Sequence, residues 1–381
     1  MPRTSALILY GATDIGANSF SSDLLWRTGF RAPDPFYLIE MGGRTTLLVS
    51  DLELERAKKE AAVDRVVAWR KYHKPGIKTT LDAVGIYLEK CGVKDLRMPS
   101  QLPYSVVAKL KSHFRAEIIP GDVYPERIVK TAREIAQIRE GQAAVEHAMH
   151  LVRRILARSR IRKSRLYLGG RVLSSEFLRE SIQADLYRLG WLALGTIVAG
   201  GKHAADPHCE GTGPLRSATP IVIDVFPLSV RSHYYADCTR TFYKGGPDAR
   251  QRAMYETVRQ AQELALSQIR GGVDGYDIQQ SVAKFFHQRG YPTRRGRSTE
   301  GFIHGVGHGV GLDIHEAPRI GGVHVKLPVG SVVTVEPGLY YQKASAKIPS
   351  GGVRIEDMVM VTATGYRNLC SLPKDLSWAV L

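Results

Sequence analysis

The sequence predicts an α+β protein of two domains, a smaller α/β domain at residues 1–125 and an antiparallel α+β domain at residues 126–381. Before the segment PGDVYPERIVKT, short apolar runs alternate with stretches of helical period. After it, long amphipathic helices are mixed with apolar strand-like runs. The Pro and Gly residues of this segment interrupt both patterns, so we place the domain boundary there.

The first domain contains five short apolar runs that indicate strands: ALILY, FYLIE, TTLLVS, RVVAW and AEIIP. Two stretches have the period of a helix, LDAVGIYLEKCG and SVVAKLKSHF. This alternation favours a sheet with helices packed on it.

The second domain begins with a long helix, for which Thr131 and Glu134 predict a capping box. Three more stretches indicate helices: SSEFLRESIQADLYRLG, ARQRAMYETVRQAQELALSQIR and YDIQQSVAKFFHQRG. Strands are indicated by PIVIDVFP, HYYADCTRTFY, GSVVTVEPGLYY and GVRIEDMVMVTA. Together these elements predict helices that cover one face of a curved antiparallel sheet.

Composition narrows the class of protein. The chain has 381 residues, of which 44% are hydrophobic, and no apolar run approaches the ~20 residues that span a bilayer. The four cysteines lie far apart and include no C-x-x-C pair, which argues against a disulfide framework or a zinc knuckle. We therefore expect a cytoplasmic protein with reduced thiols and no membrane partner.

The formal net charge is +16. Basic residues are scattered along the chain, as in RRILARSRIRKSR, and no basic stretch is interleaved with aromatic residues in the manner of a single-strand binder. A solvated basic surface is the favoured interpretation, with no specific nucleic-acid partner.

The placement of carboxylates is the most informative feature. Asp224, Glu336 and Glu356 each interrupt an apolar strand-like run, and Asp237 follows the run YYA. A buried carboxylate is costly unless it is paired, hydrogen-bonded or bound to a cation. Four of them that converge would repel one another strongly, so the pattern predicts bound cations.

Histidines form a second pattern in HGVGHGVGLDIHEAP, which contains His304, His308 and His315. Their spacing places them toward one side of a helix or at successive corners of an extended turn. The interleaved glycines allow the backbone to pass close to a site. Three histidines within twelve residues favour a functional role over incidental loop histidines.

These motifs, together with DCTRTF, VEPGLY and GVRIED, resemble the pita-bread metallopeptidases, and among them the Xaa-Pro peptidases, prolidase and aminopeptidase P. The resemblance implies a C-terminal pita-bread fold with a smaller creatinase/prolidase-like N-terminal domain. It also implies a dinuclear-metal hydrolase that cleaves the X–Pro bond of dipeptides or of peptide N-termini by means of a metal-bridged water. The implied metal ligands are Asp224, Asp237, His308, Glu336 and Glu356.

The resemblance also implies catalytic roles. Glu336 would accept the proton of the water, and His304, His315 and His208 would face the substrate. Arg354 would orient a bridging carboxylate or a substrate carboxylate. Thr239 and Arg240 would support the ligands. Cys209 and Cys238 adjoin His208 and Asp237 in the sequence, so we expect them to line the site without acting, because neither has a base partner within its own motif.

The donor set of four carboxylates and one imidazole suits two divalent ions per subunit, with Mn²⁺ as the first choice and Co²⁺ or Zn²⁺ as alternatives. The expected partners are a proline-containing peptide and, by the family's habit, a second copy of the chain in a homodimer. One departure from the family is the interval from Asp224 to Asp237, which is about two residues longer than expected and is absorbed by a longer hairpin tip.

Three alternatives stay open at this point. Methionine aminopeptidase shares the ligands, but the additional N-terminal domain disfavours it. Creatinase works without metal, and the filled ligand positions argue against it. A binding module that has lost catalysis would show missing ligands, and none is missing.

Overall fold

The computed structural model describes residues 4–73, 79–291 and 299–381. The chain divides into two compact units, Met1–Arg127 and Ile128–Leu381, and this division falls two residues beyond the boundary placed from sequence. Within the described residues, no helix combines the length and the apolar character that a membrane span requires.

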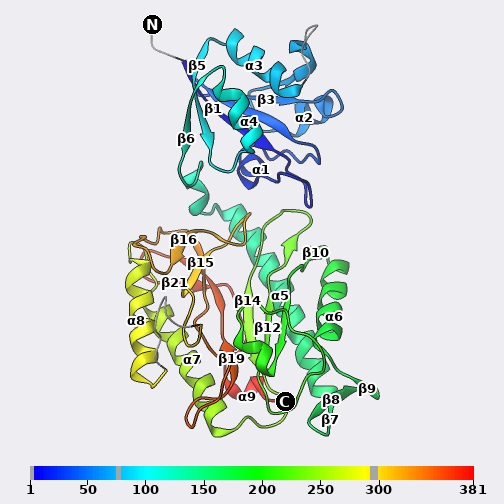
Figure 1. Cartoon of the computed structure of the whole chain (residues 1–381), viewed down its shortest axis with the longest axis vertical. Coiled ribbons are helices and arrows are strands. Elements are labelled where there is room, and N and C mark those ends of the chain that lie inside the picture. The colour runs from blue at the N-terminus through cyan, green and yellow to red at the C-terminus, as the bar shows by residue number, and fades with distance from the viewer. Residues whose placement is uncertain (1–3, 74–78, 292–298) are drawn as a thin grey trace. The chain divides into compact units, whose positions relative to one another are not determined.

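Unit 1 is built on a six-stranded mixed sheet with the order β4-β3-β2-β1-β5-β6 (Figure 1). The pairs β1–β2 and β2–β3 are antiparallel, whereas β3–β4, β1–β5 and β5–β6 are parallel. The strands are β1 (Thr4–Gly11), β2 (Phe36–Met41), β3 (Arg44–Val49), β4 (Arg65–Ala68), β5 (Val93–Pro99) and β6 (Arg115–Ile119). The helices are α1 (Ser22–Thr28), α2 (Leu54–Glu60), α3 (Thr80–Lys90) and α4 (Tyr104–Lys111).

Both faces of this sheet are covered, which explains the continuous apolar runs in its strands β1 and β2. Ile8 belongs to one buried cluster, together with Val84 of α3, and its neighbour Leu9 belongs to another, together with Leu24 of α1. Successive residues of a strand point to opposite faces, so a strand covered on both sides needs apolar residues at every position. The five strands expected from sequence are present, and β5 is an additional one.

Unit 2 has four long helices, α5 (Ala132–Arg158), α6 (Ser175–Arg188), α7 (Ala249–Gln268) and α8 (Gly275–Gln288), and a short one, α9 (Leu376–Ala379). The predicted capping box is present, because Thr131 accepts from the backbone of Glu134 and Glu134 accepts from that of Thr131. In Figure 1, α7 and α8 lie on one side of the strands and α5 and α6 on the other.

The strands of unit 2 form several small sheets. The orders that build the site are β11-β12-β14, β16-β15-β17-β20-β21 and β18-β19, and the others are β10-β13 and β7-β8-β9. Their bounds are β7 (Arg160–Arg162), β8 (Arg165–Leu168), β9 (Arg171–Val172), β10 (Trp191–Leu192), β11 (Ile197–Gly200), β12 (Ile221–Val225), β13 (Leu228–Ser229), β14 (Cys238–Phe242), β15 (Gly307–Gly309), β16 (Glu316–Ile320), β17 (Val332–Val335), β18 (Gly338–Tyr341), β19 (Gly351–Arg354), β20 (Asp357–Val361) and β21 (Tyr366–Asn368).

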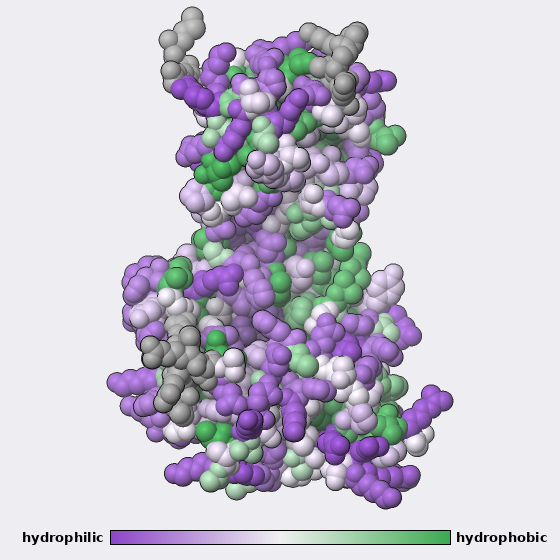
Figure 2. All heavy atoms as spheres, viewed as in Figure 1, coloured by the Kyte–Doolittle hydropathy of each residue, from purple (hydrophilic) through white to green (hydrophobic). Residues whose placement is uncertain are grey.

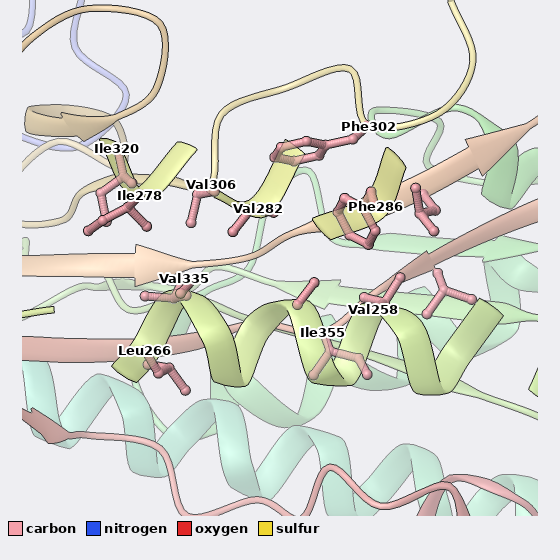
Figure 3. Packing of buried hydrophobic residues seen from close by; sticks show 14 of the residues in the cluster. Val258, Leu266, Ile278, Val282, Phe286, Phe302, Val306, Ile320, Val335 and Ile355 are labelled. Atoms are coloured by element: carbon pink, nitrogen blue, oxygen red, sulfur yellow. The ribbon is translucent and has the colours of Figure 1, made fainter. Parts of the chain in front are cut away.

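The main core of unit 2 lies between α7, α8 and these strands. Val258 and Leu266 of α7 pack with Val282 and Phe286 of α8, and Val335 and other strand residues complete the cluster (Figure 3). At about 25 cal/mol per Å² of apolar surface removed from water, such a cluster is a dominant stabilising contribution. It fixes the strands whose ends carry the acidic residues.

Candidate metal centre

The five residues that the sequence proposes as ligands all line one cavity of about 400 Å³ in unit 2. Asp224 lies within β12, His308 in the middle of β15, and Asp237 directly before β14. Glu336 follows β17, and Glu356 lies between β19 and β20. Three of the four carboxylates therefore stand just beyond the end of a strand, where the hydrogen-bond ladder stops and side chains from different sheets can converge.

Three carboxylate oxygens in this cavity are buried and have no hydrogen-bond partner among the described residues: Asp224 Oδ1, Asp237 Oδ1 and Glu356 Oε1. Burial raises the pKa of Asp237 well above its usual value, and the negative charges of Glu356 and Asp224 raise it further. Burial likewise raises the pKa of Glu356, with Glu336 and Asp224 adding to the effect. Unsatisfied, mutually repelling oxygens are the arrangement that a bound cation would relieve.

The ligand atoms also lie at suitable separations. One atom each from Asp237, His308 and Glu356 falls within 4.8 Å of the others. His308 Nε2 is 3.8 Å from Asp237 Oδ2 and 3.3 Å from Glu336 Oε1. An oxygen-rich set with one imidazole fits divalent ions such as Mn²⁺, so the residues present fit the implied metal pair.

The pKa of Glu336 is shifted in the opposite direction from those of Asp237 and Glu356. Burial acts to raise its pKa, but a hydrogen bond from His308 and the positive charges of His308, His304 and Arg354 lower it to about 2. Thr334 Oγ1 donates to Glu336 Oε1 at 3.2 Å and accepts from the backbone N–H of His308 at 3.0 Å. Glu336 is therefore ionised at neutral pH and held next to His308.

Arg354 is buried and its side-chain donors are used by protein groups. Its Nη2 donates to Asp224 Oδ2 at 2.6 Å, its Nε to Thr239 Oγ1 at 3.0 Å and its Nη1 to the Tyr340 hydroxyl at 2.9 Å. Thr239 Oγ1 in turn donates to Glu356 Oε2 at 2.8 Å. Of the two roles considered from sequence, this geometry favours orienting the carboxylates over binding a substrate carboxylate.

The three histidines outside the ligand set also line the cavity. His304 Nδ1 is 2.7 Å from the carbonyl oxygen of Gly305, and its Nε2 is 2.8 Å from the Tyr340 hydroxyl. The ring of His315 meets that of His308 edge-on, with centroids 4.3 Å apart. Burial lowers the pKa of both His304 and His315, so both are neutral at pH 7. His208 lines the cavity, and its backbone N–H donates to Asp206 Oδ1 at 3.1 Å.

The histidine segment is a strand with flanking loops, because its glycines serve close backbone packing. A Cβ on Gly307 would lie 1.9 Å from the carbonyl oxygen of Thr334, and one on Gly309 would lie 2.2 Å from that of Ala317. The sequence allowed two conformations for this segment, a helix or an extended turn. The structure has the extended one.

Two residues of the site were missed from sequence: Arg319, which lines the cavity, and Tyr340, which hydrogen-bonds two residues that line it. Tyr340 connects His304 with Arg354, and Arg319 lies directly opposite His308 in the pairing of β15 with β16. Residues opposite each other in an antiparallel pair share a face, so a register between these two short strands would have identified Arg319. Neither strand has enough residues to reveal that register in the sequence.

The cysteines expected beside the site have different places. Neither Cys209 nor Cys238 is among the described residues that line the cavity. Cys238 points behind the site, where its Sγ lies 3.8 Å from Cys370 Sγ, and Arg240 donates to both sulfurs at 3.3 and 3.4 Å. Thr239 and Arg240 both hydrogen-bond to Glu356, as predicted supports: Thr239 Oγ1 donates to its carboxylate, and Arg240 Nη1 donates to its carbonyl oxygen.

Comparison with known proteins adds independent observations. Residues 132–363 match the model of metallopeptidase family M24, and residues 5–135 match that of the creatinase/prolidase N-terminal domain. The chain is 32% identical to an Xaa-Pro dipeptidase of Pyrococcus furiosus over 346 residues, which cover 89% of this chain and 88% of that one. It is 33% identical to Xaa-Pro aminopeptidase 1 of Streptomyces coelicolor over 269 residues, which cover 65% of this chain and 52% of that one.

A solved structure described as prolidase from Pyrococcus furiosus superposes with a TM-score of 0.76 and 26% identity, covering 97% of this chain and 96% of that one. This similarity covers both units, and it identifies the fold of unit 2 as the pita-bread fold with a preceding N-terminal domain.

Proposed function

The chain belongs to metallopeptidase family M24, and from this premise we propose that it is an Xaa-Pro dipeptidase, which hydrolyses the X–Pro bond of dipeptides. The observation that carries the proposal is the convergence beside His308 of buried carboxylates, each with one oxygen that has no hydrogen-bond partner among the described residues. The first relatives found are named Xaa-Pro dipeptidases, which supports the dipeptide form of the activity.

We propose that Asp224, Asp237, His308, Glu336 and Glu356 hold two divalent ions. Bound there, the ions would neutralise the carboxylates, acidify water and polarise a carbonyl group. Arg354 and Thr239 fix the positions of Asp224 and Glu356 through the hydrogen bonds described above. The ionised carboxylate of Glu336 is the group that accepts a proton from the attacking water.

The histidines divide into two roles in this proposal. A carbonyl oxygen can only accept, so His304 Nδ1 carries the proton and its Nε2 accepts from the Tyr340 hydroxyl. His304 thereby fixes the tyrosine that contacts Arg354. His315 has no such bonds to protein groups among the described residues, and we assign it, with His208, to hydrogen bonding with the substrate.

Arg319 supports a short substrate. It lines the cavity, is exposed, and has no side-chain ion pair among the described residues. A free guanidinium is suited to a carboxylate because its fork matches the two oxygens. We propose that it binds the C-terminal carboxylate of the dipeptide, which a longer peptide would place elsewhere. Apolar residues of the same cavity, Ile197, Phe226 and Ile314, would contact the proline ring.

The test compares an X–Pro dipeptide, its C-terminal amide and an X–Pro-Y tripeptide in wild-type enzyme and in Arg319→Met. For the dipeptide, the substitution is expected to lower kcat/KM by about 10–100-fold, since a hydrogen bond to a charged group contributes about 1.5–3 kcal/mol. The amide should respond less than threefold. Faster cleavage of the tripeptide than of the dipeptide would show that the enzyme is an aminopeptidase and not a dipeptidase. Equal rates on X–Pro and X–Ala dipeptides would show that it has no specificity for proline.

We infer Mn²⁺ as the metal from the donor set, with Co²⁺ and Zn²⁺ as the alternatives. We also infer a homodimer and a cytoplasmic location, the latter from four cysteines that are all free. Metal-dependent activity, sedimentation and cell fractionation test these three inferences separately.

A further inference from the structure

A small sheet of unit 2 carries a concentration of positive charge that the peptidase cavity does not use. Its strands β7, β8 and β9 directly follow α5. Residues 153–171 include seven arginines and one lysine and no acidic residue. The positive charge of these eight side chains equals half of the formal net charge of +16. Figure 1 shows this sheet at the end of unit 2 away from β15 and β16, and hydrophilic side chains project from that end in Figure 2.

The register of the sheet gathers the arginines on one face. Arg160 pairs with Tyr167, and Arg162 pairs with Arg165. Alternate residues of a strand share a face and paired residues lie side by side, so these four side chains point the same way. Leu166, between Arg165 and Tyr167, points to the opposite face and is fully buried, whereas its partner Ile161 on that face is 46% exposed. The three arginines are exposed.

This arrangement opposes stability. Arg162 lies directly opposite Arg165, and Arg165 forms an isolated antiparallel bridge with Arg216. Like charges directly opposite each other destabilise a sheet. None of these arginines, nor Arg160, has an ion-pair partner within the described residues. The scattered basic residues of the sequence thus become a row of unneutralised guanidinium groups, which we call the cationic face (Arg160, Arg162, Arg165 and Arg216).

The turn that joins β7 and β8 also opposes stability, because its backbone conformation is strained. Its two residues, Lys163 and Ser164, have φ of 46° and 62°. The left-handed region costs a residue other than glycine about 1–2 kcal/mol, and hairpins of this kind usually contain Asn-Gly. Here the turn places a lysine at its tip, beside the cationic face. A strained conformation that concentrates charge indicates a function for that charge.

Other basic residues nearby have structural explanations and are set aside. Arg158 ends α5, where a cation is favoured by the helix dipole. Arg153 donates to the carbonyl oxygen of Trp378 and lies over its ring. Within the cationic face, Arg162 lies over the Tyr167 ring, and the other three arginines have neither a ring contact nor an ion pair among the described residues.

We propose that the cationic face binds the phosphate backbone of single-stranded nucleic acid without reading its sequence. Successive same-face residues of a strand are about 6.6 Å apart, a distance comparable to that between neighbouring phosphates of an extended strand. Arginine suits phosphate because its fork donates two hydrogen bonds. Tyr167 lies among the arginines, with the Arg162 guanidinium 5.8 Å from its ring centroid, and offers a surface on which a base stacks.

An anionic membrane presents phosphates too, but the face fits it less well. The paired apolar residue on this face is Val172, opposite Tyr167, and it is 39% exposed. Stable attachment to a bilayer needs buried apolar area in addition to charge. The proposal goes beyond the peptidase function and does not depend on it.

The test measures fluorescence anisotropy of a labelled oligothymidylate with the full chain at increasing salt, using wild type and the triple variant Arg160→Gln, Arg162→Gln, Arg165→Gln. A matched control, Arg188→Gln, Arg270→Gln, Arg367→Gln, removes the same charge from exposed positions elsewhere in unit 2. X–Pro hydrolysis is measured in parallel to show that each variant is folded.

We expect wild type and the control triple to bind with affinities within twofold of each other. The cationic-face triple variant should bind at least tenfold more weakly. The slope of its log K against log salt concentration should be shallower by about 2, because three phosphate contacts are lost. Equal weakening in both variants would reduce the effect to net charge and overturn the proposal. Binding to phosphatidylserine vesicles, with none to the oligonucleotide, would assign the face to membranes instead.

Discussion

Unit 2 contains two adjacent groups of buried charged residues, one in front, facing the cavity, and one behind it. The cost of burying their carboxylates is offset in a different way in each group. The front group is the carboxylate cluster of the cavity, Asp224, Asp237 and Glu356, whose oxygens are in part without partners. The rear group, the Arg240 network, consists of Arg240, Asp357, Lys374, Cys238 and Cys370. The two are adjacent in sequence, because Cys238 follows Asp237 and Asp357 follows Glu356.

The Arg240 network contains its own cations. Arg240 Nη2 lies 2.7 Å from Asp357 Oδ1, and Lys374 Nζ lies 2.9 Å from Asp357 Oδ2. Burial acts to raise the pKa of Asp357, but Arg240 and Lys374 lower it to about 2. In the carboxylate cluster the pKa values of Asp237 and Glu356 are raised instead. Acidic residues of similar burial thus differ because Asp357 alone is paired with two protein cations, whereas the one guanidinium ion-paired in the carboxylate cluster, among the described residues, is that of Arg354, on Asp224. Asp237 and Glu356 are left to cations from solution.

Removing a ligand from the cavity should have the largest effect. We expect His308→Ala to lower kcat/KM by at least ~10³-fold and to reduce bound metal, because even the groups that only orient ligands contribute about 10–100-fold. Elemental analysis and assays with Mn²⁺ measure both quantities. Cys370→Ala is the matched control, since Cys238, Asp357 and Cys370 also lie close enough to hold an ion. If the control loses metal and His308→Ala does not, the metal is bound by the Arg240 network and not by the carboxylate cluster.

Removing the cation of the Arg240 network should mainly reduce folding stability. Arg240→Met leaves Asp357 buried with Lys374 as its remaining ion-pair partner, and breaking a buried pair costs about 3–5 kcal/mol. Urea denaturation compared with the exposed control Arg270→Met measures the loss. If the two variants unfold at the same urea concentration, Arg240 does not neutralise Asp357 in the way described.

The smallest effect concerns pH. The folded pKa of Asp357 is about 2, below the ordinary value of 3.8, so its charge stabilises the fold above pH ~4. That contribution, about 2 kcal/mol by linkage, is lost as pH falls from about 4 toward 2. In Asp357→Asn the loss should be absent, so the stability difference from wild type should narrow in that window. Urea unfolding with chelator present, from pH 6 to pH 3, follows it, and a constant difference would contradict the assignment.

Much of the fold could be predicted from the sequence because periodicity reports burial directly. The long helices and the strands around Asp224, Glu336 and Glu356 were predicted, and the capping box at Thr131 is confirmed. Strand β5 was missed because its residues VKDLRMP mix charged and apolar side chains. The short β15 was missed because its glycines serve backbone packing and leave no hydrophobic pattern, and β16 was missed because its residues EAPRI mix charged and apolar side chains.

The sequence by itself determined the chemistry of the cavity: acidic residues placed in apolar runs are costly whatever the fold, and that cost indicated cations. Tertiary structure alone decided which residues act together. Strand register placed Arg319 opposite His308 and gathered separate arginines on one face, and sheet packing directed Asp237 into the cavity and its neighbour Cys238 behind it. The physical reason is that facing and pairing depend on partners distant in the chain, whereas the cost of burying a charge belongs to the residue itself.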